Sequence, residues 1–187
     1  MKKVRVMIIC AVIAALAIVT TGSLALFTAE GTATNVITTG GIALSLVEQA
    51  EKDGELVPFE DVVGVLPGQS VSKIVSVNND GEGEAFVRIA ADIEIELAEG
   101  VDATPDKSLV SLDFDETNWT LKDGYWYYNK PLAGGKATEP LFTAVTFAEN
   151  MGNEYQNGTI KIIVTAQSVQ TANNGTSALD ATGWPEA

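Results

Sequence analysis

Strict alternation of apolar and polar residues is the feature that most limits the fold of this chain. Between residues 85 and 97, one parity carries only apolar side chains and the other carries most of the charge. The apolar positions are Val87, Ile89, Ala91, Ile93, Ile95 and Leu97, and the opposite positions are Arg88, Ala90, Asp92, Glu94 and Glu96. Because a β-strand points successive side chains to opposite faces, this segment predicts a strand with one side on a core.

Further segments have the same character. Alternating, β-branched or aromatic runs occupy residues 42–46, 71–77, 125–128, 141–147 and 159–166. Turn-forming pairs such as Pro67-Gly68, Asp123-Gly124 and Asn157-Gly158 lie between them. No helical period is sustained beyond the apolar N-terminal run, and residues 101–115 predict a loop with a helical turn. We expect an all-β chain of one domain, a β-sandwich or a jelly roll.

The first residues predict export. Met1 to Arg5 is basic, and an apolar run from Val6 to Val19 follows it. The run is shorter than the about 20 residues that a membrane span needs. With the small residues Gly22, Ser23 and Ala25 behind it, it is typical of a cleavable secretory signal, with a cut after Ala25 by the small-residue rule. An uncleaved N-terminal anchor is the alternative.

Composition restricts the partners of the exported chain. The sequence has 25 acidic and 11 basic residues, and three of the basic ones, Lys2, Lys3 and Arg5, lie in the signal. The remainder carries 8 − 25 = −17. That charge argues against nucleic acid and anionic membrane surfaces, so we expect membrane contact only through an uncleaved signal. The single cysteine, Cys10, also lies in the signal, and the mature chain therefore has no disulfide.

The segment behind the signal has a pattern of its own. Phe27, Ala29, Gly31, Ala33 and Ile37 share one parity, and threonines dominate the other. Small side chains on one face suit a shallow groove between strands, and the glycine pair at 40–41 suits a hinge. Residues 27–39 therefore predict a strand that either pairs with a neighbouring copy or folds onto its own sheet, and the pattern alone favours neither.

These features occur in an order that resembles the TasA/camelysin family, which includes BsaA-type biofilm matrix proteins. The resemblance covers nearly the whole chain and rests on short motifs whose order is more specific than any one of them. After the basic start and apolar run, the motifs are Gly22-Ser23-Leu24-Ala25-Leu26-Phe27-Thr28, Thr34-Asn35-Val36-Ile37-Thr38-Thr39-Gly40, Ile42-Ala43-Leu44-Ser45-Leu46, Leu66-Pro67-Gly68-Gln69, Val77-Asn78-Asn79-Asp80-Gly81, Ala85-Phe86-Val87-Arg88-Ile89, Gly124-Tyr125-Trp126-Tyr127-Tyr128, Glu139-Pro140-Leu141-Phe142 and Ala178-Leu179-Asp180-Ala181-Thr182-Gly183-Trp184.

The resemblance implies a secreted Gram-positive protein of the cell surface or extracellular matrix. A SipW-type signal peptidase would cut between Leu26 and Phe27, one residue beyond the small-residue rule, although Leu26 stands where the family usually has an aromatic residue or alanine. The implied fold is a jelly-roll-like β-sandwich. Copies would polymerise into a biofilm matrix fibre or pilus by donor-strand complementation, alone or with an accessory matrix protein.

The expected layout has four parts. Residues 1–26 are the signal peptide, 27–40 the donor strand, 41–172 the β-sandwich and 173–187 a looser C-terminal tail. Phe27, Ala29, Gly31, Ala33 and Ile37 are the predicted donor-strand contacts. A secreted adhesive or carbohydrate-binding sandwich that acts as a monomer is the alternative function.

A second alternative is a metallo-endopeptidase, because camelysin carries that description. Hydrolytic zinc sites use histidine ligands, and this chain has no histidine. We therefore expect no enzyme activity, no catalytic residues, no cofactor and no metal. Asp113, Asp115 and Glu116 offer oxygen ligands for calcium, but they lack the spacing of an EF-hand and predict a solvated acidic loop, as do Asp102 and Asp106. The aromatic run at 125–128 and Trp119 predict core packing rather than a sugar platform.

Overall fold

A computed structural model describes residues 26–38 and 42–185, with the side chains of residues 31–38 left out of the description. The described part forms eleven strands and two short 3₁₀ helices. The strands are β1 (Phe27–Thr38), β2 (Leu44–Lys52), β3 (Glu55–Pro58), β4 (Val62–Val65), β5 (Ser70–Asn79), β6 (Ala85–Glu96), β7 (Val110–Leu112), β8 (Trp119–Lys122), β9 (Tyr125–Tyr128), β10 (Phe142–Phe147) and β11 (Thr159–Gln170). The 3₁₀ helices are η1 (Lys107–Leu109) and η2 (Asn153–Tyr155).

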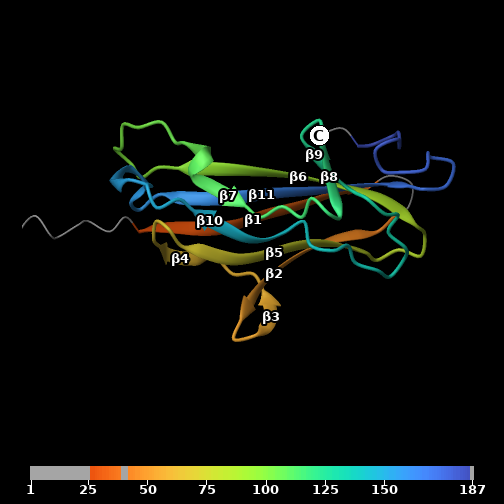
Figure 1. Ribbon diagram of the computed structural model, residues 1–187, viewed down its shortest axis with the longest axis horizontal. Coiled ribbons are helices and arrows are strands. Elements are labelled where there is room, and N and C mark those ends of the chain that lie inside the picture. Colours follow the sequence, from red (N-terminus) through yellow and green to blue (C-terminus); the bar gives the residue numbers. More distant parts are fainter. Residues whose placement is uncertain (1–25, 39–41, 186–187) are drawn as a thin grey trace, which may run out of the picture.

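The strands form two sheets that pack as a sandwich, so the expected all-β class is confirmed. The six-stranded sheet has the order β4-β1-β11-β6-β9-β8, and the five-stranded sheet has the order β3-β2-β5-β10-β7. Figure 1 shows the long strands running along the molecule, with the β2–β3 hairpin projecting from one side. The main core lies between the sheets and contains Val75, Val87, Ile89, Phe142, Ile162 and Val164.

The alternation predicted for residues 85–97 is confirmed in β6. Val87 and Ile89 are fully buried, whereas Asp92, Glu94 and Glu96 on the opposite face are exposed. Along its whole length β6 pairs with β11, which begins at the predicted Thr159 but continues to Gln170. The aromatic run is β9, where Trp126 and Tyr128 face the main core, and Trp119 is 1% exposed. The prediction of core packing is therefore confirmed for Trp119, Trp126 and Tyr128, whereas Tyr125 and Tyr127 pack in a second cluster on the outer face.

Tight turns have the geometry that their residues favour. Asp123 and Gly124 join β8 to β9 with φ values of 51° and 80°, as a type I′ hairpin requires. At Pro67-Gly68, the amide of Gln69 donates to the carbonyl oxygen of Leu66 over 3.1 Å, and Gly68 has a φ of 80°. That is the expected type II turn, in which the third residue needs a positive φ.

The C-terminal segment packs more closely than the sequence indicates. Residues 171–185 cross the outer face of the six-stranded sheet, where a second apolar cluster joins Phe86, Tyr127, Val169 and Ala178. Trp184 lies over Arg88, with 4.6 Å between the guanidinium carbon and the ring centre. Arg88 also donates to Gln167 Oε1 over 2.7 Å and to the carbonyl oxygen of Pro185 over 3.3 Å. The tail therefore covers a face that would otherwise expose apolar side chains.

Candidate functional site: the N-terminal strand and its sheet position

The N-terminal strand β1 fills an interior position of the six-stranded sheet. It lies parallel to β11, from Thr28 opposite Thr159 to Thr38 opposite Ser168. On its other side, β4 pairs antiparallel with only the first three residues, Phe27 to Ala29. Among the strand pairs that the structure describes, β1–β11 alone is parallel. In a single copy, β1 thus pairs within its own chain, which is one of the two arrangements that the sequence pattern allowed.

Phe27 anchors the beginning of this strand in the core. Its side chain is 2% exposed, and its ring packs edge-on against Phe147, with 4.9 Å between the ring centres. The register partner of Phe27 on β4 is Val65, which is equally buried. Ala29 is also buried and opposes Ile160, whereas Thr28 and Glu30 are half-buried. Alternation is therefore observed from Phe27 to Glu30, the part of β1 whose side chains are described.

The backbone register changes farther along β1. The four residues from Thr32 to Asn35 span the same stretch as the three residues from Ile163 to Thr165 of β11, so β1 contains one extra residue. Such a bulge reverses the alternation of faces beyond it. Val36 then opposes Ala166, and Ile37 opposes Gln167. The predicted contacts of Gly31, Ala33 and Ile37 lie outside the described side chains.

The predicted cleavage point lies at the entrance to this position. The amide of Asn157 donates to the carbonyl oxygen of Leu26 over 2.7 Å, and the amide of Thr28 donates to the carbonyl oxygen of Gly158 over 3.0 Å. The Leu26 side chain is 44% exposed. A cut between Leu26 and Phe27 would remove the first acceptor and keep the second bond, whereas a cut after Ala25 would keep both.

A row of charges crosses the outer face of the sheet at β1. Glu30 opposes Lys161 on β11, and Lys161 opposes Glu94 on β6. The Lys161 ammonium also contacts Glu96 Oε1 at 2.8 Å. The hydrogen bond that Lys161 donates to Glu96 raises the pKa of Lys161, and the charges of Glu96, Glu94 and Glu30 add to this effect. This row was not predicted from the sequence, although Glu30 and Lys161 are the only charged residues of their strands.

In the predicted acidic loop, the carboxylates of Asp113 and Asp115 accept hydrogen bonds from backbone amides. Asp113 accepts hydrogen bonds from the amides of Thr143 and Ala144 over 2.8 and 2.7 Å. Burial raises its pKa, but these bonds and the Thr143 hydroxyl outweigh burial and leave the pKa below its usual value. Asp115 instead accepts from the amide of Thr117 over 2.9 Å. Asp113 therefore ties the end of β7 to β10, whereas Asp115 holds the turn before β8.

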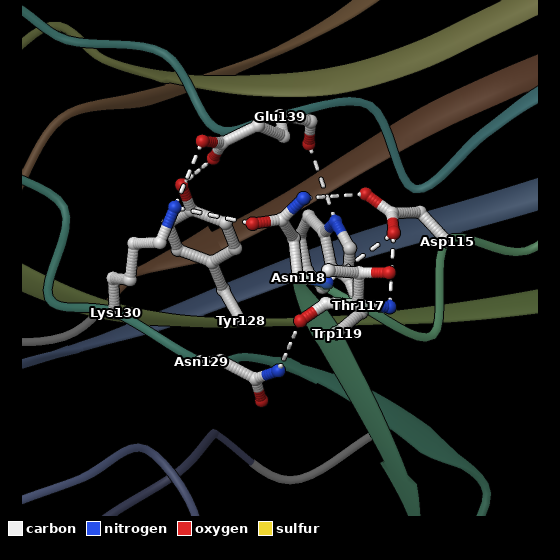
Figure 2. A network of polar contacts seen from close by, with 8 residues as sticks. All are labelled: Asp115, Thr117, Asn118, Trp119, Tyr128, Asn129, Lys130 and Glu139. Atoms are coloured by element: carbon white, nitrogen blue, oxygen red, sulfur yellow. Dashed lines mark hydrogen bonds and ion pairs between the residues drawn. The ribbon is translucent and has the colours of Figure 1, made fainter.

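Asp115 belongs to a polar network that ties the β8–β9 hairpin to the segment before β10 (Figure 2). The Lys130 ammonium lies 3.1 Å from Asn118 Oδ1 and 2.9 Å from Glu139 Oε1. Tyr128 donates its hydroxyl to the other oxygen of Glu139. Burial first, and then this carboxylate, raise the pKa of Tyr128 to about 12. A tyrosine that holds its proton this firmly acts here as a hydrogen-bond donor.

One buried ion pair lies near β4. The Lys73 ammonium contacts Glu48 Oε1 at 2.7 Å, and the Lys73 side chain is 1% exposed. The Phe59 ring covers the ammonium, with 4.0 Å from Nζ to the ring centre. Burial lowers the pKa of Lys73, and Glu48 opposes that shift. Each charge therefore neutralises the other within the protein.

Among the residues that the structure describes, no group of three or more His, Cys, Asp or Glu side chains is placed to hold a metal ion. Within the same residues, no helix combines the length and the apolar character that crossing a membrane requires.

Comparisons with known proteins do not add a family. No family model, curated protein or solved structure matches this chain. The resemblance to the TasA/camelysin family therefore stays a prediction that rests on the motifs themselves.

Proposed function

We propose that the exported chain is a structural subunit of an extracellular fibre or pilus, in which β1 of one copy fills the sheet position beside β11 of the next. The sandwich is then jelly-roll-like, as the resemblance to the TasA/camelysin family implies, and the fibre belongs to a biofilm matrix. The partners are other copies, with or without an accessory matrix protein. The work of the protein is joining rather than catalysis.

The position of β1 is the observation that carries this proposal. β1 comes first among the described strands, yet it lies inside a sheet, between β4 and β11. Without it, the long edge of β11 and the site of the Phe27 ring would be uncovered. A strand attached to its domain through one segment, here with Gly40 and Gly41, can be replaced by the same strand of another copy with the same contacts.

The sheet edges supply further support. The four edge strands, β3, β4, β7 and β8, have at most four residues each, whereas β1 has twelve. Short edge strands offer little backbone for pairing with another copy. β1 offers twelve residues, of which β4 covers only Phe27 to Ala29 on one side.

Processing would control assembly. Residues 1–26 would direct export and then be removed by a SipW-type peptidase, between Leu26 and Phe27 as the resemblance implies. The Phe27 side chain is deeply buried at the start of β1. A precursor still held at the membrane by its leader could not present this end to another copy, so uncut chains would not polymerise.

The test uses cysteine pairs, because the exported chain has none of its own. Thr28 and Thr159 are register partners on half-buried positions. Two single variants of the 27–187 chain, T28C and T159C, are purified, mixed, assembled and oxidised. Exchange predicts disulfide-linked heterodimers in the fibres. The matched control mixes T28C with T143C, whose cysteine lies at an exposed position of the other sheet.

A deletion gives a second readout. Removing residues 27–39 should leave monomers that do not form fibres but bind a synthetic 27–39 peptide. Fibres that persist after the deletion, or T28C–T159C mixtures that cross-link no more than the control, would contradict strand exchange. Size-exclusion chromatography and negative-stain microscopy of the 27–187 chain separate this function from the monomeric adhesive alternative, and a chelator-sensitive cleavage assay tests the peptidase alternative.

A further inference from the structure

The charge row on the outer face of the six-stranded sheet is sparse where β1 meets β11. Glu30 is the only charged residue among the twelve of β1, and Lys161 is the only one among the twelve of β11. The structure places these two residues directly opposite each other. Lys161 is held in place from the other side, because its ammonium contacts Glu96 at 2.8 Å and its side chain is only 21% exposed.

This arrangement is sensitive to register. In a parallel pair, a shift of one residue turns Glu30 to the opposite face of the sheet. A shift of two residues keeps the face but moves the carboxylate by roughly 6–7 Å along the strand. In either case Lys161 is left beside Glu94 and Glu96 only, and Glu30 faces uncharged neighbours such as Ile163. Only one register therefore brings the charge of β1 to the charge of β11.

We propose that Lys161 selects the register and the identity of the incoming strand by pairing with Glu30 of another copy. This inference rests on the proposed strand exchange, and it adds the residue pair that makes the exchange specific. The apolar anchor Phe27 supplies burial, but an apolar pocket alone accepts many strands. A single lysine of the acceptor attracts a strand with a carboxylate at the matching position and repels a strand with a basic residue there.

The balance of charges predicts which substitutions disrupt assembly. The row holds one lysine among Glu30, Glu94 and Glu96. K161E would place four carboxylates together, and like charges on adjacent strands oppose pairing. An E30K strand entering a K161E acceptor restores one cation among three carboxylates. A K161E acceptor should therefore bind the natural strand weakly and bind the E30K strand well.

The experiment compares labelled K161E chains of residues 27–187 alone and in equimolar mixtures. The partners are E30K and, as the matched control, K122E, which makes the same charge change at an exposed position of β8. The readout is the amount of labelled K161E in the fibre pellet at low salt. We expect K161E alone to pellet roughly tenfold less than K122E alone, from the size of cross-strand charge effects. Mixing with E30K should restore its pelleting, and mixing with K122E should not.

The double variant E30K/K161E separates exchange from pairing within one chain. Rescue in the mixture of single variants requires strands to pass between copies, whereas the double variant regains the charge pair in either arrangement. If K161E pellets like K122E, the proposed selection of the strand by Lys161 is overturned, but the proposal of strand exchange is not. Rescue in the double variant without rescue in the E30K mixture would place the pair within single chains, and would overturn both this inference and the proposed exchange.

Discussion

At the scale of single residues, Phe27 has the clearest role. Its ring is 2% exposed and fixes the start of β1 against Phe147 on β10, in the opposite sheet. F27A should lower the free energy of unfolding by about 3–5 kcal/mol, the usual cost of removing a buried phenylalanine ring. Denaturant titration of the 27–187 chain measures this loss. T28A, on the half-buried face of the same strand, is the control, and equal midpoints for the two variants would show that Phe27 is no anchor.

Tyr128 gives a prediction for alkaline pH. Its pKa is raised from 10.0 to about 12 in the folded chain, so the folded state keeps a proton that the unfolded state releases above pH 10. The unfolded state then binds fewer protons, and stability falls as the pH rises between these values. The stability advantage of the natural chain over Y128F should be constant below pH 10 and shrink above it. Denaturant titrations of both proteins at pH 8 to 11 measure the difference, and a constant gap would refute the shift.

At the scale of elements, the sequence revealed the long strands better than the short ones. β6 and β11 are long and alternate clearly over the part that the C-terminal segment does not cover, since one face packs on the core and the other carries charged or polar residues. β3, β4 and β7 have only three or four residues, too few for a period to stand out, and β7 lies within the predicted loop at 101–115. The type I′ turn at Asp53-Gly54, with φ values of 55° and 82°, was the available sign of the β2–β3 hairpin.

At the candidate site, too, the sequence predicts local features but not the pairing between distant segments. Phe27 and the alternation behind it can be recognised in the sequence, because they are local features. The partner of Glu30 cannot, because the pairing of β1 with β11 joins opposite ends of the chain and its register depends on the whole sandwich. The bulge between Thr32 and Asn35 is equally hidden, since no glycine or proline marks it in the sequence.

The C-terminal tail is an element whose attachment can be tested. Trp184 contacts the guanidinium of Arg88 and packs edge-on against Tyr127, with 5.6 Å between the ring centres. Cation–π and aromatic contacts of this kind contribute about 0.5–1.5 kcal/mol each. W184A should therefore release the tail and speed its cleavage in limited proteolysis, with the sandwich left folded. W184F keeps an aromatic ring and is the control; unchanged cleavage of W184A would mean that the tail is held elsewhere.

At the scale of the whole molecule, net charge opposes contact between copies. Without residues 1–26 the chain would carry −17, so two copies would repel each other except where a specific contact overcomes the repulsion. The proposed strand exchange would supply such a contact along a fibre, through the buried Phe27 and the twelve residues of β1. Side-by-side contact between such fibres would still be opposed by the net charge.

Fibre bundling should therefore increase with salt. The range of charge repulsion falls from about 30 Å at 0.01 M ionic strength to about 10 Å at 0.1 M. We expect assembled 27–187 chains to remain as separate fibres at low salt and to bundle as sodium chloride is added, measured by light scattering and negative-stain microscopy. Magnesium chloride at the same ionic strength shows whether divalent ions act beyond screening. Bundling that is unchanged or reduced by sodium chloride would show that net charge does not hold the fibres apart.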